Sequence, residues 1–426
     1  MNKEKTVFIL GAGTSKTIGL PLQNEILKYI FTLKPKDINI DFDFLKIEFN
    51  STEQKLLHFF EAFNEQRDIL ADFIVDNFAQ YNSKAKYFAL NKRNKDKLNI
   101  AADTNVTLED LFTIFDKIII GREHFRTYSP EKIQEVHVAL RKCIIFAIAY
   151  SNTIDVPNNN PVKTFAEKLI EHRKNVTVNT DNLSIITMNW DAYLEKTLFQ
   201  LCEEYNKTQK IGKIYPDLCF YDYCYDGDEK NKRVVSTQVK AKGYRNIKIL
   251  KLHGSINWLI CPYCGKVFVD YKQDIAVNRL QEECYCRLCL EEFDNSSTSP
   301  QLHSILITPT FMKDLNNLNI KNIWHNALLE LTEASKVVFI GYSFPDADFE
   351  MRCLLKKAIM PEAEIDVVLY TEDNPEYYRN ALTKNQISDK IMSKLSLPEK
   401  RYASFFGKNE INFYYNGMEE YLQNHF

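Results

Sequence analysis

The sequence predicts an α/β protein built on a parallel sheet, with an inserted helical region and a small cysteine-rich module. Three observations lead to this prediction. Short apolar runs, typical of strands buried on both faces, alternate with stretches of helical periodicity. One long stretch between the first two of these runs has helical periodicity with few strand signals. Five of the 10 cysteines lie between Cys261 and Cys289.

The apolar runs and the helical patterns follow one another along the chain. The runs that fit strands are residues 6–10, 184–188, 247–252, 303–307, 336–340 and 365–370. Helical patterns occupy 21–33, 163–174, 191–206, 319–334 and 346–359, and Pro21 suits the first turn of the first helix. This alternation indicates a parallel sheet with right-handed crossovers.

The chain divides into a sheet domain and three further parts. We expect the sheet domain to comprise residues 1–50 and 151–375, with a helical insertion at 51–150, a cysteine module at 258–300 and a C-terminal segment of unknown role at 376–426. The charge run at 91–97 is expected to be a solvated loop rather than a binding patch.

The composition excludes several classes of protein. Hydrophobic residues make up 45% of the 426 residues, charged residues make up 26%, and the formal net charge is −3. A general nucleic-acid or anionic-membrane binder needs a basic surplus, so we expect neither direct nucleic-acid binding nor membrane contact. No apolar run reaches the roughly 18 residues of a membrane span, and the first one is too short for a signal peptide. A cytoplasmic location is therefore expected.

A glycine-containing turn directly follows the first expected strand. Glycine is scarce, with 12 in the chain, yet this turn contains two of them. Glycines let a backbone approach a phosphate, and the N–H groups of the turn attract negative charge, so we predict a phosphate site rather than a plain tight turn. Lys16 stands where the dehydrogenase fingerprint has its third glycine, and no Walker ending is present. The residues of the turn are Gly11, Ala12, Gly13, Thr14 and Ser15.

Polar residues also follow three later strands. In open parallel sheets, ligands bind beyond the carboxyl ends of the strands, so these side chains are candidates for a binding site. The alternatives are ordinary helix N-caps for Asn189, Asp191 and Asp346, and a structural role for His253. The candidates are Thr187, Asn189 and Asp191 after 184–188, His253 after 247–252, and Gly341 and Ser343 after 336–340.

Two Cys-x-x-Cys pairs predict a structural zinc site. Cys261 and Cys264 form the first pair, and Cys286 and Cys289 the second. Four thiolates complete a tetrahedral site and leave no open position for catalysis. Cys284 is an alternative to Cys286 as a ligand. A zinc ribbon that reads nucleic acid is the rival interpretation, but the loop lacks a pronounced basic cluster.

Taken in order, these segments resemble the sirtuin family, specifically its bacterial sirtuin-like NAD-cleaving antiphage effector branch. The run from Gly11 to Ser15 with Gly19-Leu20-Pro21 resembles the family's phosphate loop, and Thr187-Met188-Asn189-Trp190-Asp191 resembles its Thr-x-Asn-x-Asp motif. His253-Gly254 is similar to its catalytic His-Gly, which precedes a four-cysteine zinc module, and Gly341-Tyr342-Ser343 is similar to its late glycine–serine motif. The resemblance implies a Rossmann-like parallel sheet with helices on both faces.

The resemblance also implies roles for single residues. Gly11, Ala12, Gly13 and Ser15 would hold the diphosphate of NAD+, and Thr14 and Thr187 would also belong to the NAD+ site. Asn189 would orient the nicotinamide ribose and the attacking group, and Asp191 would bind the nicotinamide amide. His253 would be the general base, and Gly341 and Ser343 would line the adenosine side.

One departure from the family pattern affects the expected reaction. Protein-deacylating sirtuins follow Gly-x-Pro with Asp-Phe-Arg, whereas this chain has Leu22-Gln23-Asn24. The resemblance therefore favours hydrolysis of NAD+ over acyl-lysine chemistry. The alternatives are a deacylase or ADP-ribosyl transferase, and a non-catalytic scaffold that senses NAD or ADP-ribose. By resemblance, the partners would be further copies of the chain in a homo-oligomer and a hexameric DNA-translocase ATPase.

Overall fold

The computed structural model describes most of the chain, and the statements below concern that part. It covers residues 5–34, 52–79, 94–151, 160–175, 182–219, 222–225, 233–235, 245–270, 285–286, 289, 301–308, 315, 317–345, 348–370, 397–407 and 409–426. Within these residues, no helix has the length and apolar character needed to cross a bilayer.

The main sheet has seven strands, and every pairing within it is parallel. Its order is β12-β11-β10-β1-β2-β6-β3, with β1 at the centre. Five of these strands overlap apolar runs of the sequence, because both faces of the sheet are covered, whereas β3 and β12 match none of the expected runs. The strands are β1 (Thr6–Leu10), β2 (Leu183–Thr187), β3 (Ile214–Asp217), β6 (Arg245–Lys251), β10 (Lys336–Ile340), β11 (Glu364–Val368) and β12 (Ile411–Tyr414).

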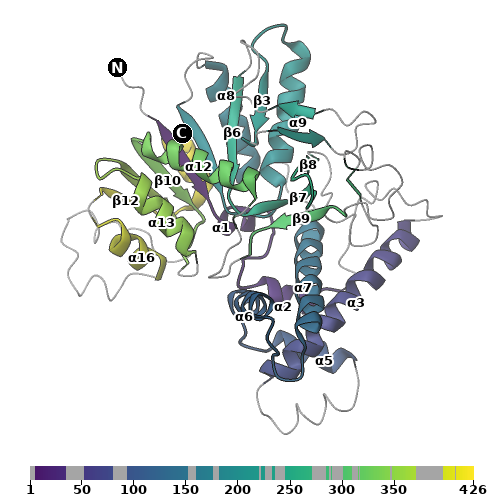
Figure 1. Ribbon diagram of the computed structural model, residues 1–426. Helices are drawn as coiled ribbons and strands as arrows, with labels where there is room; N and C mark the ends of the chain where they lie inside the picture. Colours follow the sequence, from purple (N-terminus) through teal and green to yellow (C-terminus); the bar gives the residue numbers. More distant parts are fainter. Residues whose placement is uncertain are drawn as a thin grey trace.

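Helices cover both faces of this sheet (Figure 1). Phe8 of β1 packs against Phe165 at 5.1 Å between ring centroids, whereas Phe339 of β10 packs against Tyr402 at 5.0 Å. Phe339 pairs with Ile9, so its side chain lies on the face opposite Phe8. The predicted fold class is thus confirmed. On the Phe8 face lie α8 (Pro161–Asn175), α9 (Tyr193–Thr208) and α17 (Gly417–His425), and on the other lie α12 (Leu318–Thr332), α13 (Phe349–Ala358) and α16 (Leu397–Phe405).

A second sheet has the order β5-β4-β8-β7-β9. The run at 303–307 was expected in the main sheet, but β9 pairs antiparallel with β7 in this second sheet. An apolar run shows that a strand is buried and does not show which sheet it joins, which is why the expectation was wrong. The strands are β4 (Asp222–Tyr225), β5 (Arg233–Val235), β7 (Gly254–Ile260), β8 (Val267–Val269) and β9 (His303–Leu306).

A helical unit lies below the sheets in Figure 1. Phe63 of α3 stacks on Phe146 of α7 with centroids 4.0 Å apart, and Thr107 and Asp110 form a capping box at the start of α6. The described helices of the unit are α2 (Ile26–Thr32), α3 (Thr52–Phe78), α5 (Asn94–Ala102), α6 (Leu108–Gly121) and α7 (Pro130–Ser151).

Two local expectations for this region were wrong. The helix expected from Pro21 begins at Ile26, because the backbone first makes a turn in which the Glu25 and Ile26 N–H groups donate to Leu22 O. The charge run at 91–97 was expected to be a loop, but α5 begins at Asn94. Lys97 is held there by an ion pair of 2.6 Å with Asp72.

The sequence assigned no role to the C-terminal segment, and the described part of this segment contributes an edge strand and two helices. β12 pairs with β11 along the edge of the main sheet. The Tyr421 hydroxyl of α17 donates to Asp366 Oδ2 of β11 at 2.6 Å, and Asn412 Nδ2 of β12 donates to Asp366 Oδ1 at 3.0 Å. These bonds satisfy a fully buried carboxylate and fix α17 against the sheet.

His137 makes the helical unit sensitive to acid. Neither ring nitrogen has a hydrogen-bond partner in the described chain, and the ring packs among Phe112, Phe115 and Arg141. Burial, with the Arg141 charge beside it, lowers the pKa of His137 from 6.5 to about 4. Below pH 6.5 the unfolded chain therefore binds a proton that the folded chain does not bind, and stability falls as the pH drops toward 4.

We predict that His137→Leu removes this acid sensitivity. Between neutral pH and pH 5, the protonation of this residue should lower the free energy of unfolding of the wild type by about 2 kcal/mol. The variant should not show this loss. Thermal unfolding of both proteins at the two pH values measures the difference. His325→Leu, at an exposed histidine of α12, is the matched control. The prediction would be contradicted if the thermal midpoint fell by the same amount at pH 5 in the wild type and in His137→Leu.

Candidate active site

The expected site residues follow strands that end at the same edge of the main sheet. In the register, Leu10 of β1 lies opposite Ile340 of β10 and Thr187 of β2, and Thr187 lies opposite Lys251 of β6. The segments after these four strands therefore emerge side by side. This is the carboxyl edge, where ligands of open parallel sheets bind.

The turn after β1 and the turn after β10 touch backbone to backbone. The Gly13 N–H donates to Gly341 O at 2.8 Å, and the Gly11 N–H donates to Ile340 O at 3.0 Å. Gly341 has φ +62, and a Cβ there would lie 2.3 Å from Thr14 N. Glycine is required at position 341 by both conformation and space. The expected diphosphate role of this turn stays a prediction, and the Gly11 and Gly13 N–H groups are bonded to protein carbonyls in this structure.

The turn after β2 is tied to the turn after β1 through its side chains. Asn189 Nδ2 donates to Gly11 O at 2.9 Å and to Ser15 Oγ at 3.0 Å. The Ser15 hydroxyl in turn donates to Asp191 Oδ2 at 2.6 Å. Thr187 Oγ1 accepts from the Asn189 N–H at 3.1 Å, which fixes the start of the turn. Ser15 thus links the two residues that the sequence placed in one motif.

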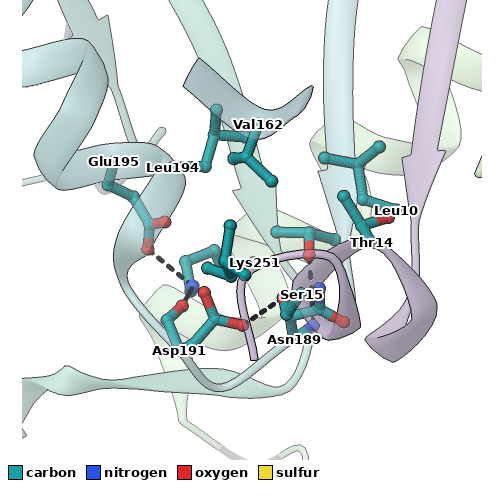
Figure 2. Close-up of a pocket in the computed structure, with 11 residues that line it drawn as sticks. Leu10, Thr14, Ser15, Val162, Asn189, Asp191, Leu194, Glu195 and Lys251 are labelled. Carbon is teal, nitrogen blue, oxygen red and sulfur yellow. Dashed lines mark hydrogen bonds and ion pairs between the residues drawn. The ribbon is translucent and has the colours of Figure 1, made fainter. Parts of the chain in front are cut away.

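These residues surround a small cavity between the sheet edge and helices α8 and α9 (Figure 2). Its free volume is about 20 Å³, which suits roughly one water molecule. A dinucleotide bound at this edge would therefore extend beyond the cavity. The cavity is not lined by six of the expected site residues, namely Gly11, Ala12, Gly13, His253, Gly341 and Ser343. The expected residues that do are Thr14, Ser15, Thr187, Asn189 and Asp191, and Leu10, Ile18, Val162, Leu194, Glu195 and Lys251 complete the lining.

A buried ion pair forms one side of the cavity, and the sequence analysis missed it. Lys251 Nζ lies 2.5 Å from Glu195 Oε1 and donates to Asp191 O at 2.5 Å. The two side chains are 1% and 2% exposed. Burial raises the pKa of Glu195, and the Lys251 charge opposes that rise. The available signal was a lysine placed between Leu250 and Leu252, at the last position of β6.

His253 lies just beyond the end of β6. Its carbonyl accepts from the Ile307 N–H at 2.9 Å, and its Nε2 lies 3.4 Å from Asp348 Oδ1. The following Gly254 has φ +77, and a Cβ there would lie 2.0 Å from Ile305 O. The position therefore requires glycine, and β9 crosses directly against it. The convergence of His253 and Asn189 on one ligand atom stays a prediction.

The loop after β10 supplies backbone and aromatic contacts at this edge. The Ser343 side chain is exposed, and Ser343 O accepts from Arg401 at 3.3 Å. Asp346, considered as a helix cap, lies outside the described residues, and the N-cap of α13 is Asp348. The expected nucleotide contacts of Gly341 and Ser343 stay predictions.

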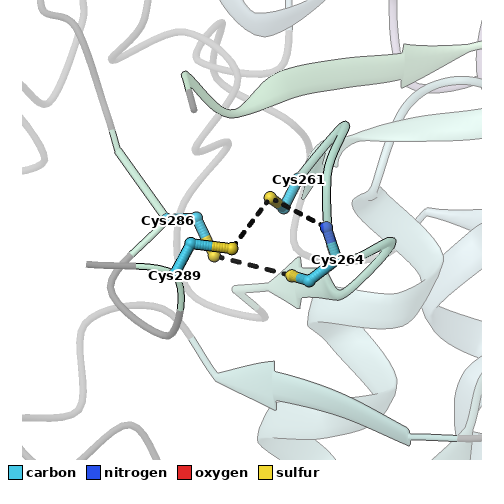
Figure 3. A group of neighbouring side chains, drawn as sticks. All are labelled: Cys261, Cys264, Cys286 and Cys289. Carbon is cyan, nitrogen blue, oxygen red and sulfur yellow. Dashed lines mark hydrogen bonds between the residues drawn. The ribbon is translucent and has the colours of Figure 1, made fainter. Parts of the chain in front are cut away.

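The four expected cysteines converge at the second sheet (Figure 3). Their sulfurs all lie within 4.8 Å of one another, and two of the Sγ–Sγ distances are 3.7 Å. Tetrahedral zinc with bonds of about 2.3 Å places its sulfurs about 3.8 Å apart, so the donor set fits the ion. The Cys264 N–H points to Cys261 Sγ at 3.5 Å, a contact that favours a thiolate. Cys284 lies outside the described residues.

Comparison with known proteins gives one family match. Residues 183–388 match the family model of the SIR2-like domain. This segment, just under half of the chain, contains the Asn189 and Asp191 turn, His253, the cysteine cluster and Gly341. The turn from Gly11 to Ser15 precedes it. No curated protein matches the chain.

Several solved structures are similar to the chain at low identity. A Sir2 homologue in complex with NAD is 10% identical, with 99% of this chain and 90% of that one covered and a TM-score of 0.38. A complex of Sir2 with a p53 peptide and NAD+ is 11% identical, with 98% and 90% covered and a TM-score of 0.35. A structure from work on sirtuin substrate affinity is 12% identical, with 98% and 91% covered and a TM-score of 0.37.

The Lys251–Glu195 pair yields a prediction about stability. Lys251→Met leaves the buried Glu195 carboxylate without its partner and should lower the free energy of unfolding by about 3–5 kcal/mol. Glu195→Leu should be similarly costly, whereas the double variant should recover much of the loss because no buried charge remains. Chemical unfolding of the wild type and the three variants gives the coupling energy.

The exposed pair Lys132–Glu135 provides the control for this cycle. Its side chains are 51% and 58% exposed. The same cycle with Lys132→Met and Glu135→Leu should give a coupling below about 1 kcal/mol. Additive losses at Lys251 and Glu195 would refute the assignment of a coupled buried pair.

Proposed function

We propose that this protein is an NAD+ glycohydrolase that cleaves NAD+ to nicotinamide and ADP-ribose. The observation that carries the proposal is the hydrogen-bonded link from Asn189 through Ser15 to Asp191 at the carboxyl edge of the sheet. It joins a phosphate-type turn to a polar turn inside the segment that matches the SIR2-like domain. The sheet domain at 1–50 and 151–375 would bind NAD+, and the helical insertion at 51–150 would flank it.

The proposed chemistry needs few catalytic groups. Cleavage of the nicotinamide–ribose bond passes through an oxocarbenium-like state, and nicotinamide leaves as a neutral molecule from a positively charged ring. No acid is therefore required to protonate the leaving group. Asn189 would orient the ribose and the attacking water, Asp191 would bind the nicotinamide amide, and His253 would accept a proton from water or a ribose hydroxyl. General-base assistance contributes roughly 10²–10⁴-fold.

Water as the acceptor is supported by the segment after Pro21. Where deacylases have Asp-Phe-Arg, this chain has Leu22-Gln23-Asn24, and the Gln23 amide donates to Glu109 of α6. The segment is thus attached to the helical unit. The chain therefore lacks the element that, by resemblance, accompanies acyl-lysine chemistry.

We further propose that the enzyme is an antiphage effector held inactive until it assembles. A protein that destroys NAD+ must be restrained in the cell, and an oligomer of this chain or a hexameric DNA-translocase ATPase would supply the control. The motif resemblance supports this part of the proposal. A cytoplasmic location would give the enzyme access to the NAD+ pool.

The cysteine cluster would hold a structural zinc ion. Cys261, Cys264, Cys286 and Cys289 would be its ligands, and the ion would tie the turn after β7 to the segment around 286–289. With four sulfur ligands it would keep no open position for substrate.

We expect the purified chain, alone or with its assembly partner, to release nicotinamide from NAD+, as measured by chromatography and mass spectrometry. His253→Ala should reduce the rate by roughly 10²-fold or more, and Asn189→Ala should also reduce it strongly. His325→Ala and Asn175→Ala, both exposed, are the matched controls.

Three outcomes would contradict the proposal that the protein hydrolyses NAD+. They are no nicotinamide under any condition, unchanged release in both site variants, and turnover only in the presence of acylated peptide. The last would favour a deacylase, and tight NAD+ binding without cleavage would favour a sensing scaffold.

Elemental analysis should find about one zinc per chain. Cys264→Ser and Cys286→Ser should lose the metal and lower the thermal midpoint, because the cross-link between two loops is lost. Cys353→Ser, at an exposed cysteine outside the cluster, and Cys284→Ser should both keep the metal. Metal retained in Cys286→Ser and lost in Cys284→Ser would transfer the ligand role to Cys284.

A further inference from the structure

Asp348 is an N-cap residue that does not cap its helix. It precedes α13 with φ −89 and ψ 52, and its carboxylate makes no hydrogen bond to the N–H groups of that helix. An aspartate cap contributes about 1 kcal/mol, so this position forgoes a local stabilisation. Its oxygens contact the Tyr342 hydroxyl and the imidazole of His253, and both of these residues lie outside the helix.

The contact with Tyr342 fixes the orientation of the carboxylate. The Tyr342 hydroxyl donates to Asp348 Oδ2 at 2.7 Å inside the protein. Burial, with the Asp348 charge beside it, raises the pKa of Tyr342 well above 10. The phenol therefore keeps its proton and donates it to Oδ2. The other oxygen, Oδ1, lies 3.4 Å from His253 Nε2, and the side chains of Asp348 and His253 are 6% and 10% exposed.

Helix α16 holds the loop that carries Tyr342. The Tyr402 hydroxyl donates to Tyr342 O at 2.8 Å. Phe344, fully buried with φ +54, packs its ring 4.7 Å from that of Phe405 and 5.1 Å from that of Tyr402. A positive φ at a phenylalanine is unfavourable and persists only where packing enforces it. The loop is therefore fixed by the C-terminal part of the chain.

The backbone of His253 is fixed independently. Ile307 N–H donates to its carbonyl at 2.9 Å, and Trp324 Nε1 donates to the preceding Leu252 O at 3.1 Å. The orientation of the ring then depends on its two side-chain torsions. A carboxylate beside Nε2 selects both the torsions and the tautomer of a histidine.

We propose that Asp348 is a positioning residue for His253, held by Tyr342 and α16, and that it keeps the proton of the neutral imidazole on Nε2. The ring then accepts protons at Nδ1. The catalytic consequence rests on the proposed function, in which His253 is the base. The orientation itself does not, because it follows from contacts within the chain.

The test is the tautomer of His253, read from ¹⁵N NMR of the full chain labelled at histidine. The signals of His253 are identified by their loss in His253→Gln. We expect the Nε2–H form in the wild type. In Asp348→Asn, the amide oxygen would still accept from Tyr342 and the NH₂ group would face the imidazole, so the tautomer should switch to Nδ1–H. Asp103→Asn, at an exposed aspartate of the helical unit, should change nothing.

Kinetics separate this proposal from the hydrolase proposal. Where the wild type cleaves NAD+, Asp348→Asn should lower kcat by roughly 10²-fold with KM little changed, because it disturbs the base and leaves binding intact. Tyr342→Phe should lower kcat by a smaller factor. This variant replaces Asp348→Asn in the test if Asp348→Asn does not fold.

An Nδ1–H wild type, an unchanged tautomer in Asp348→Asn, or an unchanged kcat in an active enzyme would overturn the positioning role. If the wild type cleaves no NAD+ but the tautomer switches as expected, the hydrolase fails and the positioning role stands.

Discussion

The arrangement of the site depends on one contact between two backbones. The turn after β1 and the turn after β10 approach so closely that a Cβ on Gly341 would lie 2.3 Å from Thr14 N. This approach brings Tyr342 and Asp348 to the carboxyl edge beside the turn from Gly11 to Ser15. The Asn189 side chain then bonds to Gly11 O on the other side. Any side chain at position 341 would separate the two loops. Glycine, which is scarce in this chain, is therefore required at this position.

The buried charges specify the site more than they stabilise the protein. Desolvation of Lys251 and Glu195 offsets most of their attraction, so the pair adds little net stability compared with apolar residues. Lys251 Nζ, however, also donates to the carbonyl of Asp191. The ammonium thus holds the turn in which Asn189 and Asp191 stand. A hydrophobic pair would fill the space without selecting one conformation of that turn.

The sequence could predict what local pattern determines and could not predict what depends on distant partners. The runs at 6–10 and 336–340 coincide with β1 and β10, because a strand buried on both faces must be apolar. The cysteines were found because ligand spacing is local. The run at 303–307 was assigned to the wrong sheet, since burial is alike in both. Glu195 and Asp348 were missed because their partners, Lys251 and His253, lie far away in the sequence. No recognisable spacing in the sequence links the members of either pair.

Hydrogen bonds connect the described part of the helical unit to segments beside the site. Gln23, on the segment after the turn from Gly11 to Ser15, donates to Glu109 of α6, and Arg141 of α7 donates to Ser304 O of β9 at 3.0 Å. Ile307, one residue beyond β9, holds the carbonyl of His253. A displacement of the unit would therefore act on both the turn from Gly11 to Ser15 and the backbone of the proposed base. Under the proposed control by assembly, a partner bound to the helices could change the site without contacting it, because both connections are direct hydrogen bonds.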